Sequence, residues 1–164
     1  MQATAKKAIS EALRLAIPDG SLSISRWAEQ YRYVDRGARP GRWSNETVPF
    51  LTEIMDAVTE PDVREIVFQK SSQVGGSELA VNIIGYFIHI DPTQVCYVAE
   101  TEDKAKAWTQ ESFDATVMKT DVLKRLVKTD VSDNNQRIKR FPGGQLTVAW
   151  ASSAPSTSIR GRPR

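Results

Sequence analysis

The stretch from residue 65 to residue 89 constrains the fold more than any other part of the sequence. Residues 66–68, Ile-Val-Phe, form a short β-branched and aromatic run between polar neighbours, which predicts a buried strand. Residues 71–76 are rich in serine and glycine and predict a loop, and the apolar pattern of 77–89 predicts a helix. A strand, a glycine-containing loop and a helix in this order are the usual setting of a phosphate-binding loop.

The next segments continue this alternation. Residues 95–99, Val-Cys-Tyr-Val-Ala, predict a second strand, and Thr101 with the acidic residues after it predicts the capped first turn of a helix that reaches about Lys119. The segments 137–141 and 146–150 flank Pro-Gly-Gly and predict a hairpin. Strands that alternate with helices indicate parallel βαβ units, so we expect an α/β fold with a parallel sheet flanked by helices.

Helices are expected to dominate the first part of the chain. Apolar residues recur at helical spacing over residues 5–16, Ser25 is placed to cap a second short helix, and Pro49 suits the first turn of a third. We therefore expect an N-terminal helical lead-in at 1–62 and the sheet-containing core at 63–164. Both belong to one domain, because 164 residues are too few for two substantial cores.

The composition excludes several classes of protein. With 40% hydrophobic and 26% charged residues, the chain is an ordinary globular one. Its longest apolar stretch, 79–90, is short for a membrane span and is interrupted by Asn82 and His89. A single cysteine, Cys96, excludes an internal disulfide framework, so we expect a reducing, cytoplasmic setting and no membrane. His89 and Cys96 have no partner at metal-ligand spacing, and a satisfied or buried structural role is expected of both.

The charge is unevenly distributed, although its sum is only +2. No Asp or Glu follows Asp133, whereas six basic residues do: Arg137, Lys139, Arg140, Arg160, Arg162 and Arg164. This basic end either faces phosphates or is balanced by acidic residues of a longer chain, and the composition leaves both readings open.

The glycine-rich loop departs from the common phosphate-binding pattern G-x-x-x-x-G-K-[ST]. With Gly75 aligned on the second glycine, Ser77 falls on the hydroxyl position, Gly76 stands where lysine is expected, and Lys70 stands at the first glycine. A cradle of backbone N–H groups at a helix N-terminus survives such changes. We expect Lys70 to fold over the loop toward the phosphates and Ser77 to hold Mg²⁺. The alternative is a tight turn that only lets the helix pack closely.

Several segments together carry a resemblance to a known family. They are Trp-Ala-Glu-Gln-Tyr at 27–31, Gly-Arg-Trp at 41–43 leading to Pro-Phe at 49–50, the variant loop at 69–78, and residues 156–162. With them the chain resembles, over nearly its whole length, the large terminase subunits of tailed phages related to the lambda packaging protein. In this family the lysine of the loop is displaced toward the strand, as Lys70 is here.

The resemblance implies a P-loop-NTPase-like fold, incomplete in this segment, and an N-terminal ATPase that uses ATP and Mg²⁺ to drive double-stranded DNA into a capsid. It implies a small terminase subunit, a portal protein and a ring of identical subunits as partners, in the host cell cytoplasm. The C-terminal nuclease domain of such proteins is expected to be absent. A Walker B strand is expected shortly after Arg164, so this segment is expected to bind ATP rather than hydrolyse it.

The resemblance also assigns candidate site residues. Lys70 and Arg160 are the catalytic candidates, with Arg160 as an arginine finger; a solvated loop arginine or a contact to DNA phosphate is the alternative. Trp43 and Phe50 are placed to lie against adenine, although core packing is the more ordinary role of aromatic residues. The candidate nucleotide-binding residues are Lys70, Ser71, Ser72, Gln73, Val74, Gly75, Gly76, Ser77, Glu78 and Trp43.

Two other functions stay open at this point. One is a nucleotide-free module, such as a truncated prophage remnant, that contacts DNA or a protein through its basic end. The other is a helicase-like ATPase that shares the same core. Nucleotide binding separates the first of these from the motor ATPase.

Overall fold

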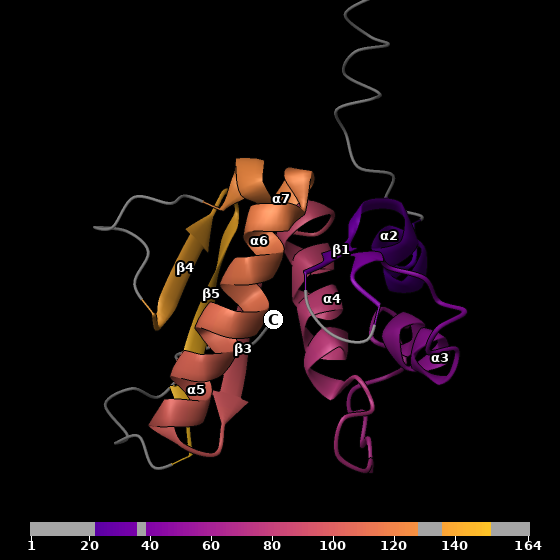
Figure 1. Cartoon of the computed structure of the whole chain (residues 1–164), viewed down its shortest axis with the longest axis horizontal. Helices are drawn as coiled ribbons and strands as arrows, with labels where there is room; N and C mark the ends of the chain where they lie inside the picture. Colours follow the sequence, from indigo (N-terminus) through magenta and orange to yellow (C-terminus); the bar gives the residue numbers. More distant parts are fainter. Residues whose placement is uncertain (1–21, 36–38, 128–135, 152–164) are drawn as a thin grey trace, which may run out of the picture.

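The computed structural model describes residues 22–35, 39–127 and 136–151. The helix predicted at 5–16 and the candidate Arg160 lie outside these residues. Within them, a three-stranded sheet stands on one side of the molecule and a group of helices on the other (Figure 1). No described helix is both long enough and apolar enough to cross a membrane.

The sheet has the strand order β3-β5-β4. Strand β3 (Gln94–Ala99) runs parallel to β5 (Gly144–Trp150), and β4 (Ile138–Phe141) pairs with β5 in the antiparallel sense. The second predicted strand, the hairpin and the α/β class are therefore confirmed. Gly144 is required at the start of β5, because a Cβ there would lie 2.2 Å from the carbonyl oxygen of Thr93.

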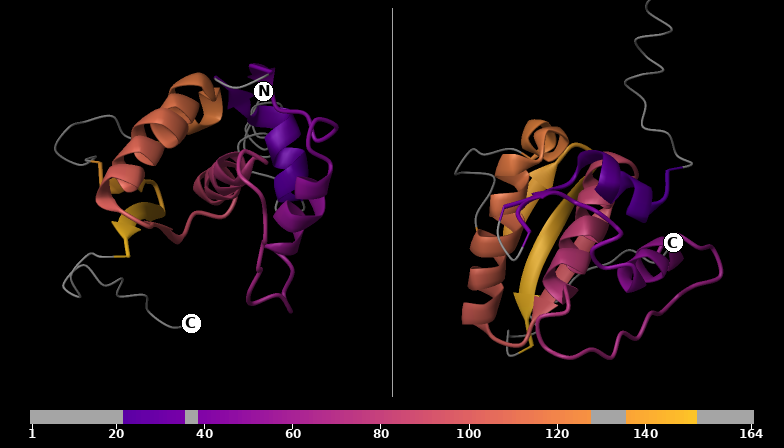
Figure 2. Two further views of the ribbon diagram at one scale, coloured as in Figure 1. Left: turned by 60° about the horizontal axis from the view of Figure 1, so that its bottom comes forward. Right: turned by 45° about the vertical axis from the view of Figure 1, so that its right-hand side comes forward.

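A continuous run of helix covers one face of this sheet. It consists of α5 (Glu102–Trp108), the π-helical segment η1 (Thr109–Asp114) and α6 (Ala115–Lys119), followed by α7 (Asp121–Leu126). Contacts of α5 with β3 and β5 place the run against the strands, in front of them in Figure 1 and beside them in Figure 2. The predicted helix to Lys119 is confirmed with Thr101 as its cap, but its sequence pattern does not predict the π-helical turn.

A second group of helices packs on α4 (Gly76–His89), on the side away from the helices that cover the sheet. It is formed by α2 (Ile24–Tyr31) and α3 (Phe50–Ala57), both of which contact α4. Trp27 of α2 is fully buried against α4 at Gly85, where a Cβ would lie 2.3 Å from the indole ring. The absence of a side chain at Gly85 therefore lets the two helices approach.

The indole of Trp27 also determines which ring nitrogen of His89 carries the proton. Its N–H donates to Nδ1 of His89 at 3.0 Å, and the ring of Tyr31 packs edge-on against the imidazole at 5.0 Å. Because an indole can only donate, Nδ1 carries no proton. Burial lowers the pKa of His89, and burial likewise raises the pKa of the Cys96 thiol. The structural role expected of His89 is confirmed.

The cap predicted for α2 is wrong by two residues. Ser23 is the N-cap and accepts a hydrogen bond from the backbone N–H of Arg26. Ser25 instead donates its backbone N–H and its hydroxyl to the carboxylate of Asp56, at 2.8 and 2.7 Å. Asp56 belongs to α3, so Ser25 makes a hydrogen bond between distant segments and does not cap its own helix.

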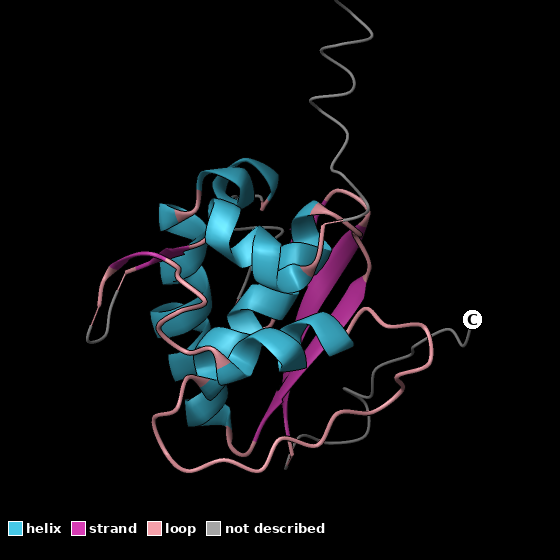
Figure 3. Ribbon diagram, turned by 90° about the vertical axis from the view of Figure 1, so that its right-hand side faces the viewer, coloured by secondary structure: helices cyan, strands magenta, loops and turns pink. Residues whose placement is uncertain are grey.

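The buried strand predicted at 66–68 does not form among the described residues. The segment between α3 and α4 is loop (Figure 3), with Val67 85% exposed and Ile66 38% exposed, while Phe68 packs partly on the core. A strand needs a neighbour that completes its backbone hydrogen bonds, and no described strand pairs with these residues. A small ribbon of β1 (Tyr33–Val34) with β2 (Gly41–Arg42) forms without having been predicted.

Candidate functional site

The glycine-rich loop ends at the N-terminus of α4. Gly75 is the N-cap, its φ of 84° lies in the left-handed region that favours glycine, and it offers no side-chain hydrogen bond to the helix. The N–H of Leu79 donates to the carbonyl of Gly75 at 2.8 Å, so the amides of residues 76–78 have no acceptor within the helix. Amides in this position, at the positive end of a helix, attract an anion.

Lys70 lies over this start of the helix. A Cβ built on Gly76 would lie 2.4 Å from Cε of Lys70 and 3.2 Å from its Nζ. Lys70 therefore occupies the space that a lysine at position 76, as in the common pattern, would need for its own side chain. Lys70 is exposed, and its Nζ donates to the carbonyl of Ser71 at 3.4 Å. A cation thus stands at the beginning of α4 although the sequence places glycine there.

A pocket of about 620 Å³ opens beside the first turn of α4. Residues 39–48 form most of its lining, together with Val34, and Gly75 and Glu78 contribute from the loop and the helix. Trp43 lines the pocket and is 8% exposed, and its indole N–H donates to the amide oxygen of Asn45 at 2.7 Å. The Trp43 ring is therefore a fixed part of the wall.

The predicted nucleotide-binding residues do not all meet in the pocket. Trp43, Gly75 and Glu78 line it, whereas Phe50 does not. Phe50 is 50% exposed, so the core packing expected of it is wrong, while Trp43 is both buried and at the pocket. The remaining loop residues lie outside the pocket lining: Lys70, Ser71, Ser72, Gln73, Val74, Gly76 and Ser77.

Arg32 is the residue that sequence reasoning missed. It follows α2 directly, and its side chain, 1% exposed, donates from Nη2 to Oε2 of Glu78 at 2.6 Å. Its Nη1 donates to the carbonyl of Tyr33, and its Nε has no hydrogen-bond partner among the described residues. Desolvation by burial lowers the pKa of Arg32, and the Glu78 carboxylate opposes that shift. The sequence does show an arginine directly after the run at 27–31. Its partner, Glu78, is 46 residues away, so local spacing does not reveal the pair.

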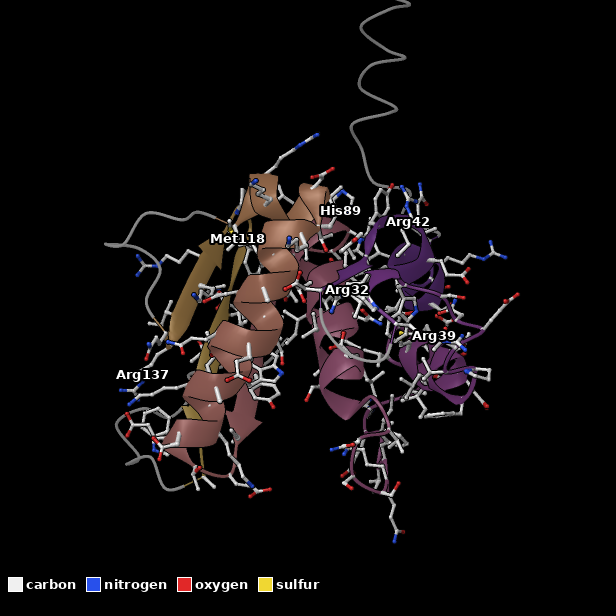
Figure 4. All side chains as sticks on the ribbon, viewed as in Figure 1. Arg32, Arg39, Arg42, His89, Met118 and Arg137 are labelled. Atoms are coloured by element: carbon white, nitrogen blue, oxygen red, sulfur yellow. The ribbon has the colours of Figure 1, made fainter. Side chains whose placement is uncertain are left out.

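Charges of both signs surround the pocket. Arg39 and Arg42 line it (Figure 4), and so do Glu46 and Glu78. Within 22–35, 39–127 and 136–151, no three acidic, histidine or cysteine side chains gather as a metal site. A divalent cation here would arrive with phosphates and take one protein ligand, and the exposed hydroxyl of Ser77 in the first helical turn suits that role.

The sheet pairs two parallel strands and carries helices on its face, and a glycine-rich loop opens a helix beside a pocket. These features define an α/β protein with a candidate anion-binding loop. The model of one family, described as phage terminase large subunit gpA, ATPase domain, matches residues 37–162. The chain belongs to this family. The matched range contains both the loop at 70–78 and Trp43.

Two curated relatives are both described as the large subunit of a terminase. The chain is 26% identical over 147 residues to the terminase large subunit of Enterobacteria phage P21, an alignment that covers 87% of this chain and 23% of the relative. It is 27% identical over 124 residues to the terminase large subunit of Escherichia phage lambda, covering 73% of this chain and 19% of the relative. The chain thus spans less than a quarter of the length of either protein.

A solved structure is similar in fold. The crystal structure of the HK97 bacteriophage large terminase superposes with a TM-score of 0.65 at 16% identity. The superposition covers 88% of this chain and 29% of that one. At this identity the likeness concerns the fold alone.

Proposed function

We propose that this chain binds ATP with Mg²⁺ through the loop at 70–78, as the ATPase part of a motor that moves double-stranded DNA into a phage capsid. Membership of the terminase large subunit family supports this proposal. The small terminase subunit, the portal protein and a ring of identical subunits are its proposed partners, in the host cytoplasm. The division into a lead-in at 1–62 and an ATPase core at 63–164 is part of the same proposal.

The position of Lys70 carries the proposal. A phosphate cradle needs backbone amides at a helix start and a cation close to the β- and γ-phosphates. Residues 76–78 offer the amides, and Lys70 lies against Gly76 where the cation of the common pattern would project. The displaced lysine thus satisfies the same chemical requirement from a different place in the sequence. A turn that only allowed close packing would not need a lysine there.

The pocket extends the site beyond the phosphates. It shares Gly75 with the loop, and Trp43 also lines it. An aromatic ring held in a pocket wall can lie against a nucleotide base, and purine bases stack well on indoles. We propose that phosphates lie at the start of α4, that the base lies toward Trp43, and that Ser77 reaches the Mg²⁺.

Turnover has a further requirement, a carboxylate that positions Mg²⁺ and the attacking water. The acidic residue in the first turn of α4 is Glu78, and it is engaged by Arg32. Glu78 is therefore not proposed as that carboxylate, and the proposal for residues 1–164 is the binding of ATP. Arg160 retains its proposed role toward the γ-phosphate of a neighbouring subunit.

Calorimetric titration of Mg²⁺–ATP tests the proposal. We expect Lys70→Ala to weaken binding by about tenfold or more, because it removes a charge-assisted contact to phosphate. Lys124→Ala is the matched control: Lys124 is an exposed lysine on α7 that does not line the pocket, so its loss should leave binding unchanged. Circular dichroism melts establish that each variant is folded.

A folded wild-type chain that binds no ATP would contradict the proposal and favour the nucleotide-free module. Equal losses in Lys70→Ala and Lys124→Ala would show that the loop cation has no special role.

A further inference from the structure

We infer that Arg32 is a positioning residue that neutralises Glu78, and thereby makes the start of α4 acceptable to the phosphates of a nucleotide. The inference rests on the proposed function and adds to it a charge compensation that the glycine-rich loop does not itself contain. The structural elements involved are the buried Arg32, Glu78 at the edge of the pocket, and the pocket wall at Trp43.

Glu78 presents a conflict at this site. It lies in the first turn of α4 and lines the pocket together with Gly75. A carboxylate and a phosphate are both attracted to the free amides of a helix start, and they repel each other when they are close. An uncompensated Glu78 would therefore oppose a polyanion in the place where the loop attracts one.

Arg32 resolves the conflict from inside the protein. Its guanidinium lies 2.6 Å from Oε2 of Glu78, and the two side chains are 1% and 33% exposed. A buried guanidinium cannot exchange its carboxylate for water at low cost, so the pair persists. Figure 4 shows Arg32 beside α4, while Arg39 and Arg42 lie farther out.

The backbone of Arg32 reaches the pocket wall as well. The backbone carbonyl of Arg32 accepts a hydrogen bond from the backbone N–H of Trp43 at 3.0 Å, and the backbone N–H of Arg32 donates to the carbonyl of Ala28. One residue thus connects the end of α2, the first turn of α4 and the aromatic wall. Its side chain adjusts the charge at the phosphate end, while its backbone supports the wall at the base end.

The charge balance of the pocket supports the inference. Arg39 and Arg42 line it against Glu46 and Glu78, so the formal charges of the lining residues cancel. Arg32 behind Glu78, together with Lys70 over Gly76, makes the surroundings of the phosphate end positive. Removal of the Arg32 charge would leave Lys70 as the cation at that end.

The test compares three ligands that differ in charge: adenosine, Mg²⁺–ADP and Mg²⁺–ATP. They are titrated calorimetrically into the wild type, Arg32→Met, Glu78→Gln and the double variant, after melts show that each is folded. We expect Arg32→Met to weaken ATP binding about threefold to tenfold, the size of a charge interaction near a protein surface. ADP should be affected less and adenosine not at all. Glu78→Gln should tighten ATP binding, and the double variant should return toward the wild type.

A merely structural role for Arg32 would produce a different pattern. All three ligands would then lose affinity alike in Arg32→Met, and Glu78→Gln would not restore ATP binding in the double variant; this pattern overturns the inference. If Arg32→Met does not fold, Glu78→Gln decides alone: tighter binding of ATP but not of adenosine supports the inference, and unchanged ATP binding contradicts it.

The same titrations separate this inference from the proposed function. A folded wild type that binds no ATP refutes both. ATP binding that depends on Lys70 but does not respond to Arg32 or Glu78 in a charge-dependent way refutes the inference alone.

Discussion

The side chain of Lys70 fills the space next to Gly76 at the start of α4. A substitution at position 76 therefore tests the position of Lys70. A methyl group there would displace the lysine chain, since its Cβ would lie 2.4 Å from Cε. Alanine is favoured over glycine in a helix by about 1 kcal/mol, so the fold should tolerate the change. We expect Gly76→Ala to weaken Mg²⁺–ATP binding severalfold, about as much as a lost charged contact, with an unchanged or higher melting temperature.

The double variant shows whether the effect passes through Lys70. In the Lys70→Ala background, Gly76→Ala should have no further effect on affinity, because residues in contact are not additive. An equal loss in both backgrounds, measured by the same calorimetry, would place the effect in the loop backbone instead.

His89 is the only histidine in the sequence and should make stability depend on pH. Burial lowers its pKa, and its Nδ1 accepts from Trp27. The unfolded chain then binds the proton more readily than the folded one, so the stabilising contribution is complete above the ordinary histidine pKa of about 6.5 and is lost as pH falls below it. We expect the free energy of unfolding to decrease from pH 7.5 to pH 5.5.

His89→Gln is the matched variant, because glutamine keeps an acceptor for the indole and does not titrate. Urea unfolding at pH 7.5, 6.5 and 5.5 should give a flatter dependence for the variant than for the wild type. Parallel pH profiles would mean that other groups cause the decrease.

At the scale of elements, the contact between α2 and α4 depends on a missing side chain. Gly85 faces the indole of Trp27, and a Cβ there would lie 2.3 Å from Cη2. Gly→Ala at an open helical site stabilises by about 1 kcal/mol. At Gly85 we expect the opposite sign, a loss of about 1–3 kcal/mol in the free energy of unfolding, because the packed helices are forced apart. Chemical denaturation measures it, and a stabilised Gly85→Ala variant would show that the two helices adjust freely.

At the scale of the whole molecule, apolar surface and unpaired backbone are exposed together. Val67 is 85% exposed in the loop before α4, and β3, whose Val98 is 56% exposed, pairs on one side only among the described strands. Surfaces of this kind pair with other chains. We expect concentration-dependent association in sedimentation velocity that Val67→Lys reduces.

Met118→Lys is the control for that prediction. Met118 is 53% exposed on α6 (Figure 4), so the change in hydrophobicity is similar, but a helix offers no free strand positions. Equal reductions in both variants would indicate a general effect of surface charge and not strand pairing.

The sequence alone was sufficient where the cause of a structure is local. The hairpin at 138–150, the strand before α5, the acidic capped start of that helix and the glycine-rich start of α4 all follow from side chains a few residues apart. The departure of the loop at 70–78 from the common pattern also led us to expect that Lys70 folds over the start of α4, and its side chain does lie against Gly76. The role of the loop toward phosphate stays a prediction.

Only the tertiary structure decided the features that depend on distant partners. Residues 66–68 have the composition of a strand, but a strand also needs a neighbour to complete its hydrogen bonds, and none of the described strands supplies one. Ser25 has the chemistry of a cap, but Asp56 takes its hydroxyl. Arg32 pairs with Glu78 across 46 residues, and the packing of α2 on α4 is what brings the two together. Hydrogen bonds and ion pairs of this kind are set by which segments pack together, and local spacing in the sequence does not contain that information.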